Sequence, residues 1–211
     1  MTQPTLYPDL QHSIQRIQAT TLAIEREEKT TGLAKLIHHA RSSGDVSLLF
    51  VCTHNSRRSQ MAQAWAQALS WYFGLNIPCY SGGMEVTTFH TAARAALVYA
   101  GFRITKDQGN FNLWQLRYSG NAEPVQLYSK LVDDPHNPKQ HFIAVMTCSD
   151  ADENCPVVPG SLHRFALNYN DPRVADNTPQ QEEAYRRCSE QIAGEMFTLF
   201  GKVSSYGESE T

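Results

Sequence analysis

Hydrophobic residues recur at helical spacing over residues 9–39, and beyond residue 45 the pattern changes to that of a sheet. Residues 46–51 (VSLLFV) form a continuous apolar run bounded by turn residues, which predicts a buried strand. Gly32 is expected to separate two helices of the first segment. Residues 1–44 are therefore expected to form an N-terminal helical arm, either a layer over the core or a dimerisation surface. The apolar positions behind this prediction are Leu10, Ile14, Ile17, Ile24, Leu33, Leu36 and Ile37.

The rest of the chain alternates short apolar runs with amphipathic segments. An Ala- and Gln-rich stretch, residues 60–73, predicts a helix that ends at Gly74. Alternation of this kind is typical of a parallel α/β sheet. We therefore expect an α/β domain over residues 45–203, built on a small doubly wound four-stranded parallel sheet flanked by helices. The further segments are expected strands at residues 77–81, 141–147 and 163–169 and expected helices at residues 89–100 and 178–200.

Residues 105–140 interrupt this rhythm with a polar stretch that contains scattered aromatic residues. Its two alternating pieces, near residues 111–118 and 125–131, predict a β-hairpin-like insertion in the domain. Residues 204–211 are expected to be a tail. The aromatic residues of the insertion that are candidates for a flap over a binding site are Trp114, Tyr118 and Tyr128.

The composition narrows the class of protein. Of the 211 residues, 41% are hydrophobic and 18% are charged, which favours a folded globular chain over a disordered or fibrous one. Lys and Arg number 18 against 21 Asp and Glu, so a net charge of -3 gives no basic surplus for a nucleic-acid groove. The sequence contains no run of about 18 apolar residues and starts without the pattern of a signal peptide. We expect a cytoplasmic protein that binds neither nucleic acid nor a membrane.

Five cysteines are an odd and small number for a secreted disulfide framework, and they favour free or reactive thiols in a reducing compartment. Cys52 directly follows the first predicted strand, and Arg58 lies in the loop that leads to the next helix. Backbone N–H groups and the dipole at a helix N-terminus hold a tetrahedral oxyanion, and the same field stabilises a thiolate. Arg58 adds a planar fork for two oxygens of the anion.

This loop is therefore a candidate oxyanion site with Cys52 as its nucleophile. Ser59 is placed to donate a hydrogen bond to the Cys52 sulfur, and Asn55 is a residue type that tolerates a left-handed turn. The alternative is a buried cysteine that merely ends a strand. The residues expected to bind the anion are Thr53, His54, Asn55, Ser56, Arg57, Arg58 and Ser59.

Cys148 and Cys155 flank an acidic loop that follows the strand predicted at residues 141–147. Two thiols this close in sequence can act as an attacking and a resolving cysteine if the loop folds back, and the alternative is two unpaired cysteines at a loop edge. A zinc site that combines them with His163 has the wrong spacing for the usual paired motifs. We expect neither a metal nor a cofactor.

Asp171 precedes Pro172 directly after the strand predicted at residues 163–169, at the sheet edge where ligands bind. A carboxylic acid there can protonate a leaving oxygen, although the same dipeptide also starts ordinary turns. Asp134 precedes Pro135 in the same way but lies in the insertion. Asp171 is therefore the better candidate for a general acid.

Three segments of the sequence resemble one group of enzymes. Residues 52–62 (CTHNSRRSQMA) are similar to the active-site loop of the low-molecular-weight protein tyrosine phosphatases and, more closely, of the thioredoxin-coupled arsenate reductases that share their fold. Residues 148–156 (CSDADENCP) resemble the redox segment of those reductases, and residues 170–172 (NDP) resemble the Asp-Pro of both groups. The resemblance covers residues 46–104 and 141–200 and leaves out the arm and the insertion.

The resemblance implies an arsenate reductase. In this hypothesis the thiolate of Cys52 attacks arsenate, Arg58 stabilises the charge, and Asp171 protonates the departing oxygen. Cys148 then attacks Cys52 and releases arsenite, and Cys155 takes over the disulfide for reduction by a partner such as thioredoxin. Two other functions stay open: a phosphatase that hydrolyses aryl phosphates through a Cys52 phosphoenzyme, and a non-catalytic protein that binds phosphate groups.

Two positions depart from the family pattern. Arg57 stands where the family's loop often has a second cysteine, and Gln63 stands where an acidic residue can help to hold a potassium ion. Ion binding is therefore not expected. The residues expected to pack in the core or on a helix face are Cys79, Cys188, Trp65, Trp71 and Tyr72.

Overall fold

A computed structural model describes residues 5–155 and 157–208. Its centre is a four-stranded parallel sheet in the order β2-β1-β6-β7. Every residue of β1 and β6 is buried, which explains their continuous apolar runs, because a parallel sheet is covered on both faces. The strands are β1 (Ser47–Cys52), β2 (Cys79–Gly83), β6 (Phe142–Met146) and β7 (Ser161–Ala166).

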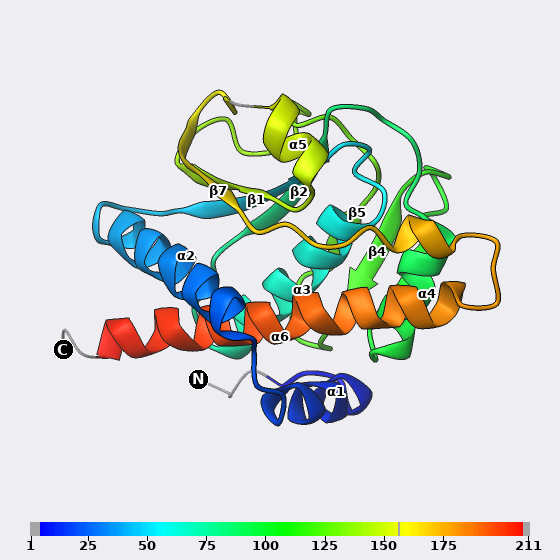
Figure 1. Ribbon diagram of the computed structural model, residues 1–211, viewed down its shortest axis with the longest axis horizontal. Helices are drawn as coiled ribbons and strands as arrows, with labels where there is room; N and C mark the ends of the chain where they lie inside the picture. Colours follow the sequence, from blue (N-terminus) through cyan, green and yellow to red (C-terminus); the bar gives the residue numbers. More distant parts are fainter. Residues whose placement is uncertain (1–4, 156, 209–211) are drawn as a thin grey trace.

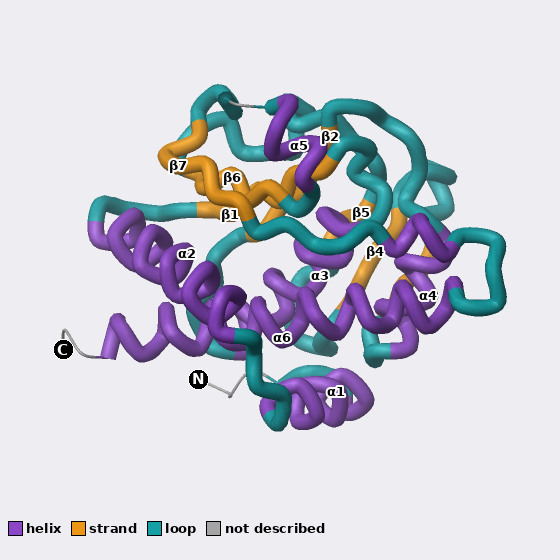
Figure 2. The backbone as a smooth tube through the Cα atoms, in the orientation of Figure 1, coloured by secondary structure: helices purple, strands orange, loops and turns teal. Residues whose placement is uncertain are grey.

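Helices cover both faces of this sheet. Figure 2 shows the strands as one layer, with α2, α3 and α6 on one side and α5 on the other. The larger apolar core lies on the first side, and a smaller apolar cluster lies under α5. This arrangement confirms the predicted four-stranded parallel α/β sheet flanked by helices. The helices beyond the first are α2 (Ile24–Ser42), α3 (Arg58–Tyr72), α4 (Thr91–Tyr99), α5 (Ser149–Asn154) and α6 (Gln181–Glu208).

The N-terminal helices α1 (Pro8–Gln18) and α2 both pack on α6 (Figure 1). Their apolar side chains belong to the larger core. Gly32 lies inside α2, so the prediction that it separates two helices is wrong, and the break falls at residues 19–23. Gly32 faces the ring of Phe165 where α2 meets β7. This packing outweighs the weak helix propensity of glycine, which is about 1 kcal/mol below that of alanine.

The insertion forms a three-stranded antiparallel sheet in the order β3-β4-β5 rather than a hairpin alone. Tyr118 is buried edge-on against Trp71 with 5.8 Å between ring centres, and the Arg94 guanidinium lies 4.0 Å from the ring centre of Trp114. These contacts pack the small sheet against α3 and α4, so the prediction of a flap over the site is wrong for Trp114 and Tyr118. The strands are β3 (Arg103–Lys106), β4 (Trp114–Arg117) and β5 (Val125–Leu127).

The closing helix α6 is longer than the sequence pattern suggested. It runs to Glu208, so the prediction of a tail is wrong for residues 204–208, and residues 209–211 lie outside the described residues. Val203 is buried, and Tyr206 packs edge-on against His38 of α2, so tertiary contacts stabilise these last turns. Within the described ranges, no helix is both long and apolar enough to cross a bilayer.

Candidate active site

The loop between β1 and α3 has Cys52 at its start and Arg58 at its end. It is tied together from within, because Asn55 Nδ2 donates to Ser59 Oγ at 2.9 Å and Gln60 Nε2 donates to the carbonyl of Asn55 at 2.8 Å. Asn55 is buried in a left-handed conformation with φ 45°, which confirms the turn predicted at this residue. The loop is therefore fixed by its own side chains.

The neighbouring strand and the insertion hold the loop from outside. Lys130 donates its backbone N–H to Asn55 Oδ1 at 3.0 Å, and Ser129 donates its hydroxyl to the carbonyl of His54 at 2.8 Å. Gly83, the last residue of β2, lies so close that a Cβ atom there would stand 2.7 Å from the backbone nitrogen of Asn55. Only glycine permits this approach. The insertion thus supports the loop instead of covering it.

The thiol of Cys52 is almost fully buried at the N-terminal end of α3. Its sulfur lies 3.0 Å from Ser59 Oγ. Because Ser59 Oγ already accepts the hydrogen bond from Asn55, its own hydrogen is available to the Cys52 sulfur. The predicted contact between Ser59 and Cys52 is confirmed, and a hydroxyl donor in this position favours a sulfur that carries negative charge.

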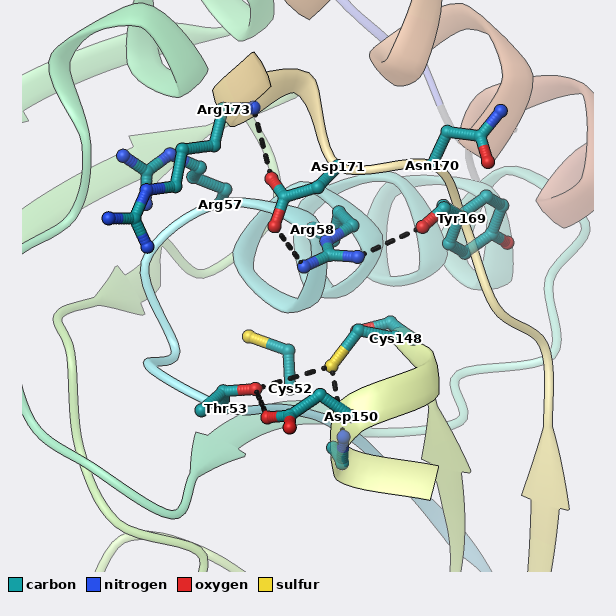
Figure 3. A network of polar contacts seen from close by, with 12 residues as sticks. Cys52, Thr53, Arg57, Arg58, Cys148, Asp150, Tyr169, Asn170, Asp171 and Arg173 are labelled. Atoms are coloured by element: carbon teal, nitrogen blue, oxygen red, sulfur yellow. Dashed lines mark hydrogen bonds and ion pairs between the residues drawn. The ribbon is translucent and has the colours of Figure 1, made fainter. Parts of the chain in front are cut away.

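Arg58 joins the loop to the segment that follows β7. Its Nη1 donates to the carbonyl of Tyr169 at 2.9 Å, and its Nη2 donates to Asp171 Oδ2 at 2.5 Å (Figure 3). The side chain is 13% exposed, and its Nε is buried with no hydrogen-bond partner in the described part of the chain. A guanidinium N–H that is free in this way suits an oxygen of a bound anion.

Asp171 lies at the sheet edge where the sequence predicted it. Its Oδ1 caps the short helix η1 (Pro172–Ala175). Asp134, the other Asp-Pro candidate, is bound within the insertion, where it accepts a hydrogen bond from the hydroxyl of Tyr128 at 2.9 Å. The structure therefore brings Asp171 and not Asp134 to Arg58.

A second buried thiol faces the loop. Cys148 follows β6 and is the N-terminal cap of α5, where its sulfur accepts the backbone N–H of Ala151 at 3.3 Å. The same sulfur lies 3.6 Å from Thr53 Oγ1, and Figure 3 shows it beside Cys52. Thr53 Oγ1 also donates to Asp150 Oδ2 at 2.5 Å, which fastens α5 to the loop. Cys52 and Cys148 thus belong to one site.

Cys155 lies half-buried at the other end of α5. Seven residues along an α-helix span about 10 Å, whereas the Cα atoms of a disulfide lie about 4.4–6.8 Å apart. Both cysteines are free thiols, and α5 must unwind before they can bond. Arg164 of β7 holds this end of the helix, because its Nε donates to the carbonyl of Cys155 at 2.9 Å and its Nη2 pairs with Asp152 Oδ1 at 2.6 Å.

Two other loop side chains fasten the loop to its surroundings. Ser56 donates its hydroxyl to the carbonyl of Thr88 at 2.6 Å, and His54 Nε2 lies 3.2 Å from a carboxylate oxygen of Glu85. Their side chains therefore position the loop, and their backbone N–H groups remain the predicted donors to an anion.

Arg57, at the position where the family's loop often has a cysteine, is tied to distant residues. Its Nε donates to the hydroxyl of Tyr185 at 2.6 Å and its Nη2 to Asp176 Oδ2 at 2.8 Å, and the Tyr185 hydroxyl donates to Asp176 Oδ1 at 2.7 Å. His90 stacks on Tyr185 with 5.2 Å between ring centres. Burial alone would raise the pKa of Asp176, but the hydrogen bonds from Tyr185 and Arg57 hold it below its ordinary value.

Sequence reasoning missed Tyr185 and Asp176, the two partners of Arg57, and His90, which stacks on Tyr185. Asp176 and Tyr185 lie 119 and 128 residues away in the chain, and neither belongs to a motif. The only local signal for His90 is its place at the start of the helix predicted at residues 89–100. The network could be found only once the fold had brought α6 and the segment after η1 against the loop.

Comparison with known proteins agrees with this geometry. Residues 47–107 match the family described as low molecular weight phosphotyrosine protein phosphatase. The chain is 29% identical over 126 residues to arsenate reductase 2 of Staphylococcus epidermidis, which covers 60% of this chain and 78% of that protein. It is 25% identical over 157 residues to the arsenate reductase of Bacillus licheniformis, which covers 74% of this chain and 96% of that protein.

Solved structures share the fold at lower identity. A low molecular weight protein tyrosine phosphatase from T. tengcongensis superposes with a TM-score of 0.52 at 18% identity, covering 75% of this chain and 99% of that one. The arginine phosphatase YwlE from Geobacillus stearothermophilus superposes with a TM-score of 0.51 at 16% identity, and the superposition covers 78% of this chain and 97% of that one. The match over residues 47–107 and the arsenate reductase relatives support a place for this chain in the low molecular weight protein tyrosine phosphatase superfamily, near the arsenate reductases.

Proposed function

We propose that this protein is a cysteine-dependent arsenate reductase that forms arsenite through disulfide exchange from Cys52 to Cys148 and then to Cys155. The observation that carries the proposal is the buried Cys148 sulfur, 3.6 Å from Thr53 Oγ1 and beside Cys52 (Figure 3). Hydrolysis of a phosphate ester uses Cys52, Arg58 and an acid, and it gives a second buried thiol no task. Reduction of an oxyanion gives the second thiol a role, since the reaction needs two electrons from a pair of thiols.

The first step is attack by the Cys52 thiolate on arsenic. Arsenate binds to the backbone N–H groups of the loop and to Arg58, whose buried Nε is free to donate. A sulfur–arsenic bond forms and one oxygen departs as water after it takes a proton from Asp171. Arsenic stays in its pentavalent state on Cys52 at this point.

The second step is attack by the Cys148 thiolate on the Cys52 sulfur. A disulfide bond forms, the sulfur–arsenic bond breaks, and its electron pair remains on arsenic, which leaves as trivalent arsenite. The N–H of Ala151, which already points at the Cys148 sulfur, stabilises negative charge on it before the attack. The two thiolates have then supplied the two electrons.

The third step passes the disulfide outward. The thiolate of Cys155 attacks Cys148, a Cys148–Cys155 bond forms, and Cys52 leaves as a thiolate ready for the next arsenate. α5 unwinds for this step, because its two ends are too far apart for a disulfide while it is helical. A cytoplasmic dithiol reductant such as thioredoxin then reduces this disulfide, which it reaches at the half-buried Cys155.

The test compares wild type, Cys148→Ser and the matched control Cys79→Ala, which removes a buried thiol in β2. Arsenite production with thioredoxin and hydrolysis of p-nitrophenyl phosphate are measured side by side. We expect Cys148→Ser to lose arsenite production and to keep any Cys52-dependent hydrolysis, while the control keeps both. Undiminished arsenite production in Cys148→Ser would contradict the cascade. Hydrolysis without arsenate turnover in the wild type would instead support a phosphatase, and phosphate binding without turnover a binding protein.

A further inference from the structure

Arg26, on α2 of the N-terminal arm, reaches the segment that carries Asp171. Its Nε and Nη2 donate to the two carboxylate oxygens of Glu195 at 2.6 and 2.5 Å, and its Nη1 donates to the carbonyl of Asn168 at 2.9 Å. Glu195 lies on α6 with no exposed side-chain surface, and Gln191 donates a further hydrogen bond to it at 3.1 Å. One guanidinium therefore joins the arm, the closing helix and the segment after β7.

The contacts continue from there to the loop. The Arg26 guanidinium lies 5.1 Å from the ring centre of the buried Tyr169, and the Tyr169 carbonyl accepts a hydrogen bond from Arg58 Nη1 at 2.9 Å. Figure 3 shows Tyr169 and Asp171 on the same short segment, both bonded to Arg58. The consecutive carbonyls of Asn168 and Tyr169 are thus each held by an arginine, one from the arm and one from the oxyanion loop.

From these contacts we infer that Arg26 is a positioning residue that holds the backbone at Asn168 and Tyr169, so that the carboxyl of Asp171 lies against Arg58. The N-terminal arm is then a working part of the active site. The segment from residue 167 to residue 171 has no regular secondary structure of its own, so its course depends on such contacts. The match to the phosphatase family begins only at residue 47, so Arg26 belongs to the part of the chain outside it. The inference rests on the proposed role of Asp171.

A single substitution cannot test this, because Arg26→Met leaves the buried carboxylate of Glu195 without its partner and destabilises the fold. The double variant Arg26→Met/Glu195→Met removes both charges and fills the space with apolar side chains of similar volume, a change that buried ion pairs often tolerate. Its matched control is Glu27→Gln. This removes a second ion pair between α2 and α6, Glu27 to Lys202 at 3.3 Å, and leaves the Asp171 segment untouched.

The experiment measures melting temperature, KM and kcat for arsenate reduction with thioredoxin. We expect the double variant to keep its melting temperature within a few degrees and its KM within about twofold, since the oxyanion loop is unchanged, and to lose kcat by about 10-fold or more through misplacement of Asp171. The control should match the wild type in all three. Adding Asp171→Asn to the double variant should lower kcat no further than Asp171→Asn alone, because both changes act through one carboxyl.

Each outcome decides a separate question. A normal kcat in the double variant, together with a slow Asp171→Asn, overturns the role of Arg26 and leaves the proposed function standing. A loss of kcat that follows a fall in melting temperature, or losses that multiply in the triple variant, also overturns it, because Arg26 would then act on stability or independently of Asp171. An Asp171→Asn variant as fast as the wild type instead contradicts the acid role in the proposed function.

Discussion

The Cys52 loop and α5 both follow a parallel strand and both hold a buried thiol, yet they are built differently. The loop is tied by the buried side chains of Asn55 and Gln60 and is held from outside by β2 and the insertion. α5 has six residues, exposes Glu153, and is gripped at its C-terminal end by Arg164. Attack on an oxyanion is fastest in a site already in place, whereas transfer of a disulfide needs a segment that can unwind. A fixed loop beside a releasable helix suits the proposed cascade.

Removing the nucleophile of the fixed loop should have the largest effect. A serine hydroxyl at position 52 is a far weaker nucleophile near neutral pH than a thiolate, so Cys52→Ser should lower arsenite production and aryl phosphate hydrolysis by about 10³-fold or more. Steady-state assays of both reactions check this. A variant that retained a tenth of either wild-type rate would show that Cys52 is not the nucleophile of that reaction.

The rigidity of the loop can be broken at Asn55. Asn55→Gly keeps the left-handed backbone but loses the bonds to Ser59 and Lys130, at a cost of about 1–3 kcal/mol in the free energy of unfolding. Asn55→Ala loses the same bonds and adds about 1–2 kcal/mol for a Cβ atom in the left-handed region. Urea unfolding of the two variants measures both losses, that of the hydrogen bonds and that caused by the Cβ atom. Equal stability of the two would mean that the left-handed turn carries no strain.

The releasable helix can be loosened at Arg164, which holds the carbonyl of Cys155 and the carboxylate of Asp152. Arg164→Gln removes these contacts and should lower the free energy needed to unwind α5 by about 1 kcal/mol. Formation of the Cys148–Cys155 disulfide should then be about fivefold faster. Rapid quenching with a thiol-alkylating reagent and mass analysis follows this step after one turnover. His163→Gln, the neighbouring change on β7, is the control that should leave the rate alone. A slower step in Arg164→Gln would show that the contacts of Arg164 assist the disulfide exchange.

Much of the fixed loop could be predicted from the sequence because its determinants are local. Asn55 and Ser59 lie within seven residues of Cys52, so a strand, a tight loop and a helix suffice to bring them together. Asp171 could be placed as well, since the carboxyl ends of parallel strands meet at one edge of a sheet. The distance between Cys148 and Cys155 could not be predicted, because the same acidic stretch fits either an open loop or a short helix.

The long-range contacts could not be predicted for a different reason. Arg26 meets Glu195 across 169 positions in the chain, and no local pattern marks either residue. Gly32 fails as a helix break because Phe165 packs against it, so a tertiary contact reverses a local preference. Specific side-chain partners of this kind follow from how α2 and α6 are stacked, which periodicity alone does not determine.

The smallest expected effect is a dependence of stability on pH, which the Cys52 loop should show and α5 should not. Burial and the neighbouring cations Arg57 and Arg94 hold the pKa of His90 below its ordinary value of about 6.5, against the opposing charge of Asp176. The unfolded chain therefore binds this proton more readily than the folded chain. The stabilising contribution of neutral His90 is complete above about pH 6.5 and is lost as the pH falls through the lower, folded pKa.

His90 acts on the loop side of the site, because it stacks on Tyr185, which binds Arg57 of the loop. In His90→Asn the melting temperature should fall less between pH 7 and pH 5 than in the wild type, by up to about 3 °C. Hydrogen exchange at both pH values locates the change, which should appear as faster exchange at the start of α3 in the wild type while α5 stays the same. Equal loosening of both regions on acidification would mean that the loop and α5 open as one unit, and the contrast between them would not hold.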